Sequence, residues 1–247
     1  MKVVYLLTFF SILIFSFNGT DAMAQKSFEK DTIVTSEGPA EIWFIGHGTL
    51  MIAFDGRVIH VDPYSAVADY SALPGADIVL VTHEHSDHLD LKAIEKIRKE
   101  DTKFYCNLLS APALPGATVM KNGDILMSGN MRIEAVPAYN VRHESSQGNP
   151  FHPKGEGNGY ILTLGDKRIY IAGDTEPIPE MAEIKDIDIA FLPMNLPYTM
   201  TPEMVADAVR MFHPAILYPY HYGNTDPEQL LPLLAGSKTE VRIRDLK

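Results

Sequence analysis

Short apolar runs separated by turn residues recur along this chain, a pattern typical of buried β-strands. Runs at 41–45, 49–54, 57–61 and 76–81 are rich in Val, Ile and Phe, and Asp55-Gly56 is a hairpin signal between two of them. Further strands are expected at 103–106, 118–120, 125–127, 131–136, 159–163, 168–172, 187–192 and 215–218. Residues 25–39 are polar, and we expect them to be irregular.

Three helices are expected between these strands. Asp90 can cap a helix over 91–100, and Thr201, followed by Pro202, can cap a second helix that carries apolar residues to Phe212. A last helix opens at Asp226 and is kinked or shortened by Pro232. Several strands and then a helix occur twice, which favours two β-sheets packed face to face with helices outside.

Composition supports one sizeable domain, and the charge excludes two classes of partner. The chain has 247 residues, of which 46% are apolar, so residues 25–247 can form a single domain with a large core. The net charge of −11, without a Lys/Arg cluster, argues against binding to nucleic acid or to an acidic membrane surface. Cys106 is the only cysteine, so no intrachain disulfide forms, and it is expected in the core.

The N-terminus has the three parts of a secretory signal peptide. Lys2 precedes an apolar run at 3–17, and the small residues Ala22 and Ala24 mark a cleavage site. The run is shorter than the roughly 18 residues of a membrane span, although an uncleaved anchor is the alternative. We therefore expect a signal peptide at 1–24 and a mature protein secreted outside the cytoplasm, in a bacterial periplasm, without membrane attachment after cleavage.

The most informative segment is the loop after the strand at 76–81. It carries His83, His85, Asp87 and His88, and imidazole and carboxylate are the ligands that zinc and related metals take. A polar loop alone does not explain why three of the nine histidines fall between positions 83 and 88. The pattern predicts a metal site.

Three later residues can complete that site, because each also follows a strand. Asp174 can bridge two cations, His221 ends the strand near 218, and His152 lies in a loop rich in Pro and Gly, with His143 as a weaker rival. Each residue also fits a purely structural role: Asp174 as an aspartate in a turn, His221 as a packed histidine and His152 as a solvated loop residue.

Together these segments resemble the metallo-β-lactamase superfamily over nearly all of the mature chain. The resemblance rests on Gly46-His47-Gly48, Asp62-Pro63, Thr82 to His88, Gly173-Asp174-Thr175 and Pro219 to Gly223. It implies an α/β (α+β) fold, the four-layer αββα sandwich, with its site at one rim of the sheets. Within the superfamily the chain is most similar to the metal-dependent hydrolases that include the L-ascorbate 6-phosphate lactonases.

One departure from the family pattern affects the ligand assignment. Many members place a metal-binding histidine where this chain has Asn140, which is a poor zinc ligand. We therefore assign that role to His152 and keep His143 in reserve. If neither histidine reaches the metal, one of the two sites would be incomplete and the protein would work with a single cation.

The resulting hypothesis has two divalent ions, Zn²⁺ first, with Mn²⁺, Ni²⁺ or Fe²⁺ as alternatives. His83, His85 and His152 hold one ion, Asp87, His88 and His221 hold the other, and Asp174 bridges. A water between the ions, with a pKa near 7, would supply a metal-bound hydroxide that attacks a carbonyl or phosphoryl centre while Asp87 orients it.

Several other residues have candidate supporting roles. Asp62 can accept the N–H of a ligand histidine, or it can simply cap a turn before Pro63. A substrate pocket could include residues that equally suit a surface or structural role: His47, Tyr139, Lys154 and Tyr198. His60 and His213 look structural.

The leading function is a secreted metal-dependent hydrolase acting on an ester, lactone or phosphoester of a small molecule. A β-lactam is a less suitable substrate, and a nuclease is disfavoured by the acidic charge. The alternatives are a di-iron redox protein, for which we would expect an additional flavin domain that these 247 residues do not show, and a metal-binding protein without turnover. The natural substrate and the oligomeric state, a homo-oligomer included, stay open.

Overall fold

The computed structural model describes residues 28–247, and they form two seven-stranded β-sheets. The first sheet contains β1 (Lys30–Thr35), β2 (Gly38–Gly46), β3 (Thr49–Phe54), β4 (Arg57–Val61), β5 (Ala76–Val81), β6 (Arg98–Cys106) and β7 (Thr118–Val119), in that order. The second contains β8 (Ile125–Ser128), β9 (Met131–Ala138), β10 (Gly157–Leu164), β11 (Lys167–Ile171), β12 (Ile189–Pro193), β13 (Ile216–Tyr220) and β14 (Glu240–Val241), again in chain order.

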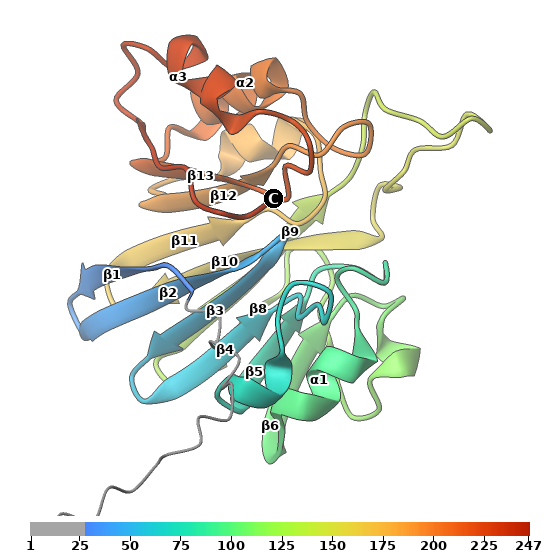
Figure 1. The fold of residues 1–247 in the computed structure, drawn as a ribbon, viewed down its shortest axis with the longest axis vertical. Coiled ribbons are helices and arrows are strands. Elements are labelled where there is room, and N and C mark those ends of the chain that lie inside the picture. Colours follow the sequence, from blue (N-terminus) through green and yellow to red (C-terminus); the bar gives the residue numbers. More distant parts are fainter. Residues whose placement is uncertain (1–27) are drawn as a thin grey trace, which may run out of the picture.

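Helices cover the outer faces of both sheets, which gives the expected four-layer αββα sandwich (Figure 1). Helix α1 (Leu91–Ile97) lies outside the first sheet, and α2 (Pro202–Phe212) and α3 (Leu230–Leu233) lie outside the second. Short 3₁₀ turns complete the elements: η1 (Tyr70–Ala72), η2 (Ala111–Ala113), η3 (Pro179–Glu183) and η4 (Pro227–Gln229). No helix among residues 28–247 is both long and apolar enough to cross a membrane.

The core lies between the two sheets because alternate strand residues point inward. On β10, Tyr160, Leu162 and Leu164 are fully buried, and the Tyr160 hydroxyl donates to the Val81 carbonyl oxygen of the opposite sheet at 2.8 Å. Burying this apolar surface is the main driving force for folding. The Cys106 thiol is buried at the end of β6, as the sequence predicts.

Strand direction places the site. Strands β4 to β7 run parallel in the first sheet, and β11 to β14 run parallel in the second. The carboxyl ends of parallel strands meet at one edge of a sheet, so the loops after β5, β11 and β13 can come together.

Two local predictions are wrong at the N-terminal side. Residues 25–39 are not all irregular, because the edge strand β1 pairs antiparallel with β2, from Lys30 opposite Trp43 to Thr35 opposite Gly38. The helix expected over 91–100 ends at Ile97, since Arg98 already pairs with Ala76 as the first residue of β6. The proposed signal peptide at 1–24 lies outside the described residues.

The predicted helix ends agree with the structure elsewhere. Asp90 accepts from the Lys92 N–H at 2.9 Å, and Thr201 accepts from the Met204 N–H at 3.2 Å. The last helix is short, as Pro232 predicts: a 3₁₀ turn leads into four α-helical residues.

Candidate metal centre

The loop that follows β5 brings four of the predicted ligands to the rim of the first sheet. It turns back on itself through hydrogen bonds from the His88 and Leu89 N–H groups to the His85 carbonyl oxygen, at 2.9 and 2.8 Å. His83 and His88 are buried, whereas His85 is exposed and Asp87 is partly exposed. The loop therefore presents two buried ligands and two that face solvent.

The other three predicted ligands come from distant segments and meet this loop. Asp174 follows β11, His221 follows β13 and His152 lies in the loop between β9 and β10; all three are at most 5% exposed. The Asp174 carboxylate lies between the groups, with Oδ2 3.3 Å from His152 Nε2 and 3.5 Å from His221 Nε2, and Oδ1 3.5 Å from His88 Nε2. The carboxylate therefore lies between the two predicted ligand sets.

The ligand atoms fall into overlapping clusters, in each of which all atoms lie within 4.8 Å of one another. One cluster contains His83, His85 and His152. A second contains Asp87, His88 and His221 together with His47, and a third joins His83 and His88 to Asp174. The two ligand sets expected from the sequence are therefore each assembled in space.

A buried hydrogen-bond relay orients two of the imidazoles. Asp62 is fully buried, and it accepts from His88 Nδ1 at 2.8 Å, from the Thr82 hydroxyl at 2.6 Å and from the Thr82 N–H at 2.8 Å. The Thr82 hydroxyl oxygen in turn accepts a hydrogen bond from His83 Nδ1 at 3.0 Å. In their neutral forms both imidazoles therefore carry the proton on Nδ1 and leave the Nε2 lone pair directed into the centre.

Asn140 orients His152. Its side-chain oxygen accepts from His152 Nδ1 at 2.6 Å and from the His152 N–H at 2.8 Å, while its Nδ2 donates to the Tyr198 carbonyl oxygen. The amide of Asn140 therefore takes no ligand role itself but holds a histidine from farther along the loop. The sequence alone does not reveal this role of Asn140.

The donor atoms at the centre fit a cation. His152 Nε2 and Asp174 Oδ1 are buried without a hydrogen-bond partner among residues 28–247, and His88 Nε2 lies 3.1 Å from His221 Nε2. Buried lone-pair atoms that face one another are costly unless a proton or a cation lies between them. Imidazole nitrogens and carboxylate oxygens suit a divalent metal.

His47 belongs to the surroundings of the second ligand set rather than to the set itself. Its Nε2 donates to Asp87 Oδ2 at 3.0 Å, and its ring lies against that of His221, with 3.7 Å between the ring centroids. Two imidazoles on one ion with metal–nitrogen bonds near 2.1 Å would have centroids roughly 4.5–5.2 Å apart. His88 and His221, at 5.1 Å, meet that condition, whereas His47 and His221 do not.

The electrostatic environment sets the protonation states of the buried residues in the centre. Burial holds the pKa of His83 well below its ordinary value, and the nearby His88 adds to this, so His83 is neutral. Burial would raise the pKa of Asp174, but His221 and His88 hold it well below its usual range. Burial would lower the pKa of His88, but Asp174 and Asp62 raise it, so His88 must release a proton when a metal binds.

Two glycines allow the close approach of these loops. A Cβ on Gly48 would lie 3.0 Å from His88 Cε1 and 3.4 Å from His221 Cδ2. Gly173 has φ +65°, and a Cβ there would lie 2.7 Å from the Asn158 carbonyl oxygen. A side chain at either position would displace Asp174 or the two imidazoles.

Some residues with predicted roles lie elsewhere. The reserve ligand His143 contacts Glu176, with Nδ1 2.5 Å from Oε1, and takes part in none of the clusters. Lys154 pairs with Glu180 at 2.8 Å, and the Tyr139 hydroxyl donates to the same carboxylate. His60 is buried with Nε2 bonded to the Pro74 carbonyl oxygen, and His213 ends α2 in a left-handed conformation.

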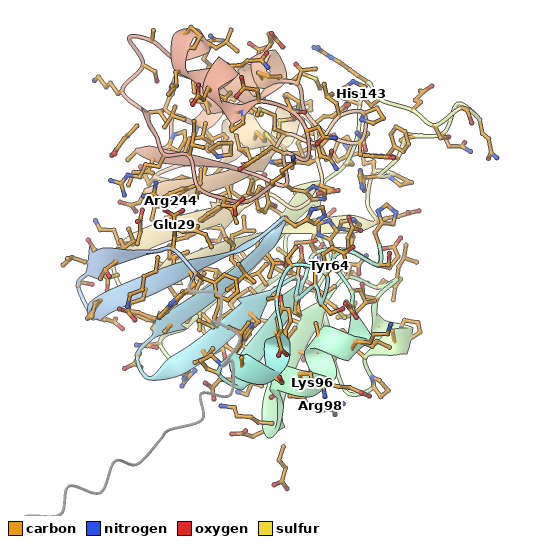
Figure 2. The ribbon with its side chains drawn as sticks, viewed as in Figure 1. Glu29, Tyr64, Lys96, Arg98, His143 and Arg244 are labelled. Atoms are coloured by element: carbon orange, nitrogen blue, oxygen red, sulfur yellow. The ribbon has the colours of Figure 1, made fainter. Side chains whose placement is uncertain are left out.

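Glu176 anchors the loop that carries His152. This carboxylate is fully buried and accepts the N–H groups of Val141, Arg142 and His143 at 2.6, 2.6 and 2.9 Å. The loop between β9 and β10, drawn in yellow-green, projects from the body of the molecule (Figure 1). Figure 2 shows His143 on this loop, on the same side of the molecule as Tyr64.

Comparisons with known proteins identify the family. The profile of the beta-lactamase superfamily domain matches residues 41–221. A UPF0173 metal-dependent hydrolase of Thermococcus kodakarensis is 33% identical over 221 residues, which cover 82% of this chain and 95% of that protein. A UPF0173 metal-dependent hydrolase of Enterococcus faecalis is 34% identical over 209 residues, covering 74% and 87%.

Solved structures agree in fold. A crystal structure from Parabacteroides distasonis ATCC 8503, named as a candidate metal-dependent hydrolase, has 52% sequence identity and a TM-score of 0.86, with 90% of this chain and 100% of that chain covered. Igni18, a metallo hydrolase of Ignicoccus hospitalis, shares the fold at 24% identity and a TM-score of 0.68, with 84% and 95% covered. The closer likeness to L-ascorbate 6-phosphate lactonases stays a prediction. This chain belongs to the metallo-β-lactamase superfamily and, within it, to the UPF0173 metal-dependent hydrolases.

Proposed function

We propose that this chain, a metal-dependent hydrolase, adds water across an ester, lactone or phosphoester bond of a small molecule. The observation that carries the proposal is the convergence of seven ligand side chains from four separate loops, with Asp174 between the two sets. Beside them opens a cleft of about 480 Å³, a volume suited to a small-molecule substrate.

Each ligand has a place in the proposal. His83, His85 and His152 would hold one divalent ion, Asp87, His88 and His221 would hold the other, and Asp174 would contact both. Such ions, when bound, bring the pKa of water to about 7 and polarise a carbonyl or phosphoryl oxygen. We propose Zn²⁺, because five of the seven ligands are imidazoles.

The chain's own groups orient the reactants. Asp87 lines the cleft, and its carboxylate can accept a hydrogen bond from a water molecule there and so direct the oxygen lone pair at the substrate. Burial would raise the pKa of Asp87, but the imidazoles of His221 and His47 beside it hold the pKa far below its usual range. Asp87 therefore stays an acceptor across the physiological pH range.

Metal loading combined with a substrate panel tests the proposal. The protein is stripped with a chelator, reloaded with Zn²⁺ or Mn²⁺, and assayed with nitrophenyl esters, lactones, bis(4-nitrophenyl) phosphate and a chromogenic cephalosporin. We expect turnover that requires the metal and that is lost in Asp87→Ala while the circular dichroism spectrum is kept. Turnover that survives Asp87→Ala, or iron near two per chain with visible absorbance, would contradict a hydrolase built on this site.

We also propose that the protein is exported. The support is the charged start, apolar run and small-residue cleavage site at positions 1–24. Expression of the full chain in a Gram-negative host, followed by N-terminal sequencing of the periplasmic fraction, should give a mature start at Gln25. A cytoplasmic protein that retains Met1 would contradict export.

A further inference from the structure

The walls of the cleft beside the ligands differ in chemistry from its floor. The floor consists of the ligands His85, Asp87, His152, Asp174 and His221. The remaining lining residues are Tyr64, Ser86, Phe151, Asn195 and Tyr198. Three of these five are aromatic, and none carries a charge.

The aromatic residues of the cleft lining come from three separate segments. Phe151 and Tyr198 meet edge to face, with ring centroids 5.0 Å apart and an interplanar angle of 73°. Tyr198 is 45% exposed, so this pair keeps a large ring surface available. Tyr64, from the segment after β4, lies against the His47 ring at 5.4 Å on the side of the second ligand set.

One side chain contacts the segments that carry two of these rings. Asn140 Nδ2 donates to the Tyr198 carbonyl oxygen, while its side-chain oxygen accepts from the N–H of His152, the residue after Phe151. The Asn140 amide therefore joins the backbone segment of Tyr198 to the segment of Phe151 and His152. A preformed aromatic pair of this kind binds a flat or apolar group without first having to be ordered.

Cationic side chains are absent from the cleft lining as far as residues 28–247 show. Lys154 is the cationic residue nearest in sequence to the cleft residues Phe151 and His152, but it pairs with another group. Its Nζ lies 2.8 Å from Glu180 Oε1 and 4.8 Å from the centroid of the Tyr139 ring. Phosphate groups in proteins are usually held by Arg or Lys in addition to any metal. The oxygens of a phosphoester that do not reach the ions would find no positive partner on these walls.

We infer that the substrate is an uncharged carboxylic ester or lactone that carries an aromatic or flat apolar group, and not a phosphoester. The inference rests on the proposed function and narrows its substrate class. One water adds across the acyl C–O bond: its oxygen bonds to the acyl carbon, that carbon releases the alkoxide oxygen, and the alkoxide takes up a proton. An ester gives an acid and an alcohol, and a lactone gives a hydroxy acid.

The test compares matched substrates on the Zn²⁺-loaded full chain. The aromatic lactone 3-isochromanone is paired with δ-valerolactone, which is also a six-membered lactone of a primary alcohol, and 4-nitrophenyl benzoate with 4-nitrophenyl phosphate and bis(4-nitrophenyl) phosphate. We expect kcat/KM for 3-isochromanone to exceed that for δ-valerolactone about tenfold, mainly through KM. For both phosphoesters we expect kcat/KM to lie at least a hundredfold below that for the benzoate.

Variants assign this preference to the walls. Tyr198→Ala and Phe151→Ala should each reduce the ratio of kcat/KM between 3-isochromanone and δ-valerolactone severalfold, with bound zinc and far-UV circular dichroism unchanged. Trp43→Leu is the matched control, because Trp43 is an aromatic residue of β2 outside the cleft, and it should leave the ratio as in the wild type.

The outcomes separate the inference from the proposed function. A phosphoester turned over faster than every ester and lactone would overturn the inference and leave a metal-dependent hydrolase in place. A lactone ratio near one, or a ratio that neither wall variant changes, would overturn the aromatic part. Turnover of neither substrate class by metal-loaded protein would overturn the proposed function and the inference with it.

Discussion

Replacing Asp62 by Asn should weaken metal binding even though Asp62 contacts no metal site directly. The carboxylate accepts three hydrogen bonds, from His88 Nδ1 and from the hydroxyl and N–H of Thr82. An Asn that keeps its oxygen toward the Thr82 N–H must turn its NH₂ toward His88 Nδ1. His88 would then have to accept at Nδ1 and carry its proton on Nε2, which is the atom that faces the centre.

The structure sets the size of this effect. Either His88 takes the wrong tautomer, or a buried charge-assisted hydrogen bond is replaced by two opposed donors, at a cost of about 1.5–3 kcal/mol. Since 1.4 kcal/mol is a factor of ten, the affinity for the second ion should fall roughly 10- to 150-fold. This agrees with the 10- to 100-fold losses typical when such supporting hydrogen bonds are removed.

A competition assay measures the loss. Apo protein is titrated with Zn²⁺ in the presence of a chromogenic chelator, and the dissociation constant of each site is compared between the wild type and Asp62→Asn. Asp77→Asn is the matched control, because Asp77 also accepts a backbone N–H, from Val58 at 2.7 Å, but at the opposite end of β5. A folded Asp62→Asn protein with wild-type zinc affinity would refute the tautomer argument.

Three further predictions concern other parts of the structure. His47→Ala should lower kcat/KM about tenfold or more, because Asp87 loses the hydrogen bond from the imidazole. His47→Gln should retain part of the activity, since a Gln amide can also donate to Asp87. Equal losses of kcat/KM in the two variants would contradict the role of His47 in positioning Asp87. Glu176→Gln should weaken the hydrogen bonds to the N–H groups of residues 141–143 and so make this loop more mobile. Limited proteolysis should then cleave the loop faster than in the wild type. An unchanged cleavage rate would mean that other contacts hold the loop in place. Burial lowers the pKa of His60 to about 4 from 6.5, so the unfolded chain binds the proton more readily than the folded chain. The free energy of unfolding should therefore fall by up to about 3 kcal/mol as the pH drops from 6.5 towards 4. In urea-unfolding measurements His60→Gln should reduce this fall between pH 6.5 and 4, and a fall equal to that of the wild type would contradict the prediction.

Much of the fold follows from local signals in the sequence. Buried parallel strands read as continuous apolar runs, so the bounds of β5 could be predicted to the residue and those of β12 to within two residues. Strand β1 could not, because at the edge of the sheet it is half exposed and its sequence, Lys30–Thr35, mixes charged and β-branched residues. Its place depends on pairing with β2, which is a property of the assembled sheet.

The ligands could be predicted where a strand leads directly into them. His83 to His88, Asp174 and His221 all follow strands whose carboxyl ends meet at one rim. His152 is different, because the loop that carries it is long and its position depends on Asn140 and Glu176. These supporting contacts join residues 12 to 35 positions apart, a separation at which the sequence pattern holds no geometric signal.

Anomalous diffraction from crystals of the Zn²⁺-loaded protein, collected on both sides of the zinc absorption edge, locates the bound ions directly. We expect two zinc peaks at the rim of the sandwich. One should lie among His83, His85 and His152 and the other among Asp87, His88 and His221, with Asp174 in contact with both. Zinc found only at surface residues, or no zinc peak near Asp174, would contradict a metal centre built from these side chains.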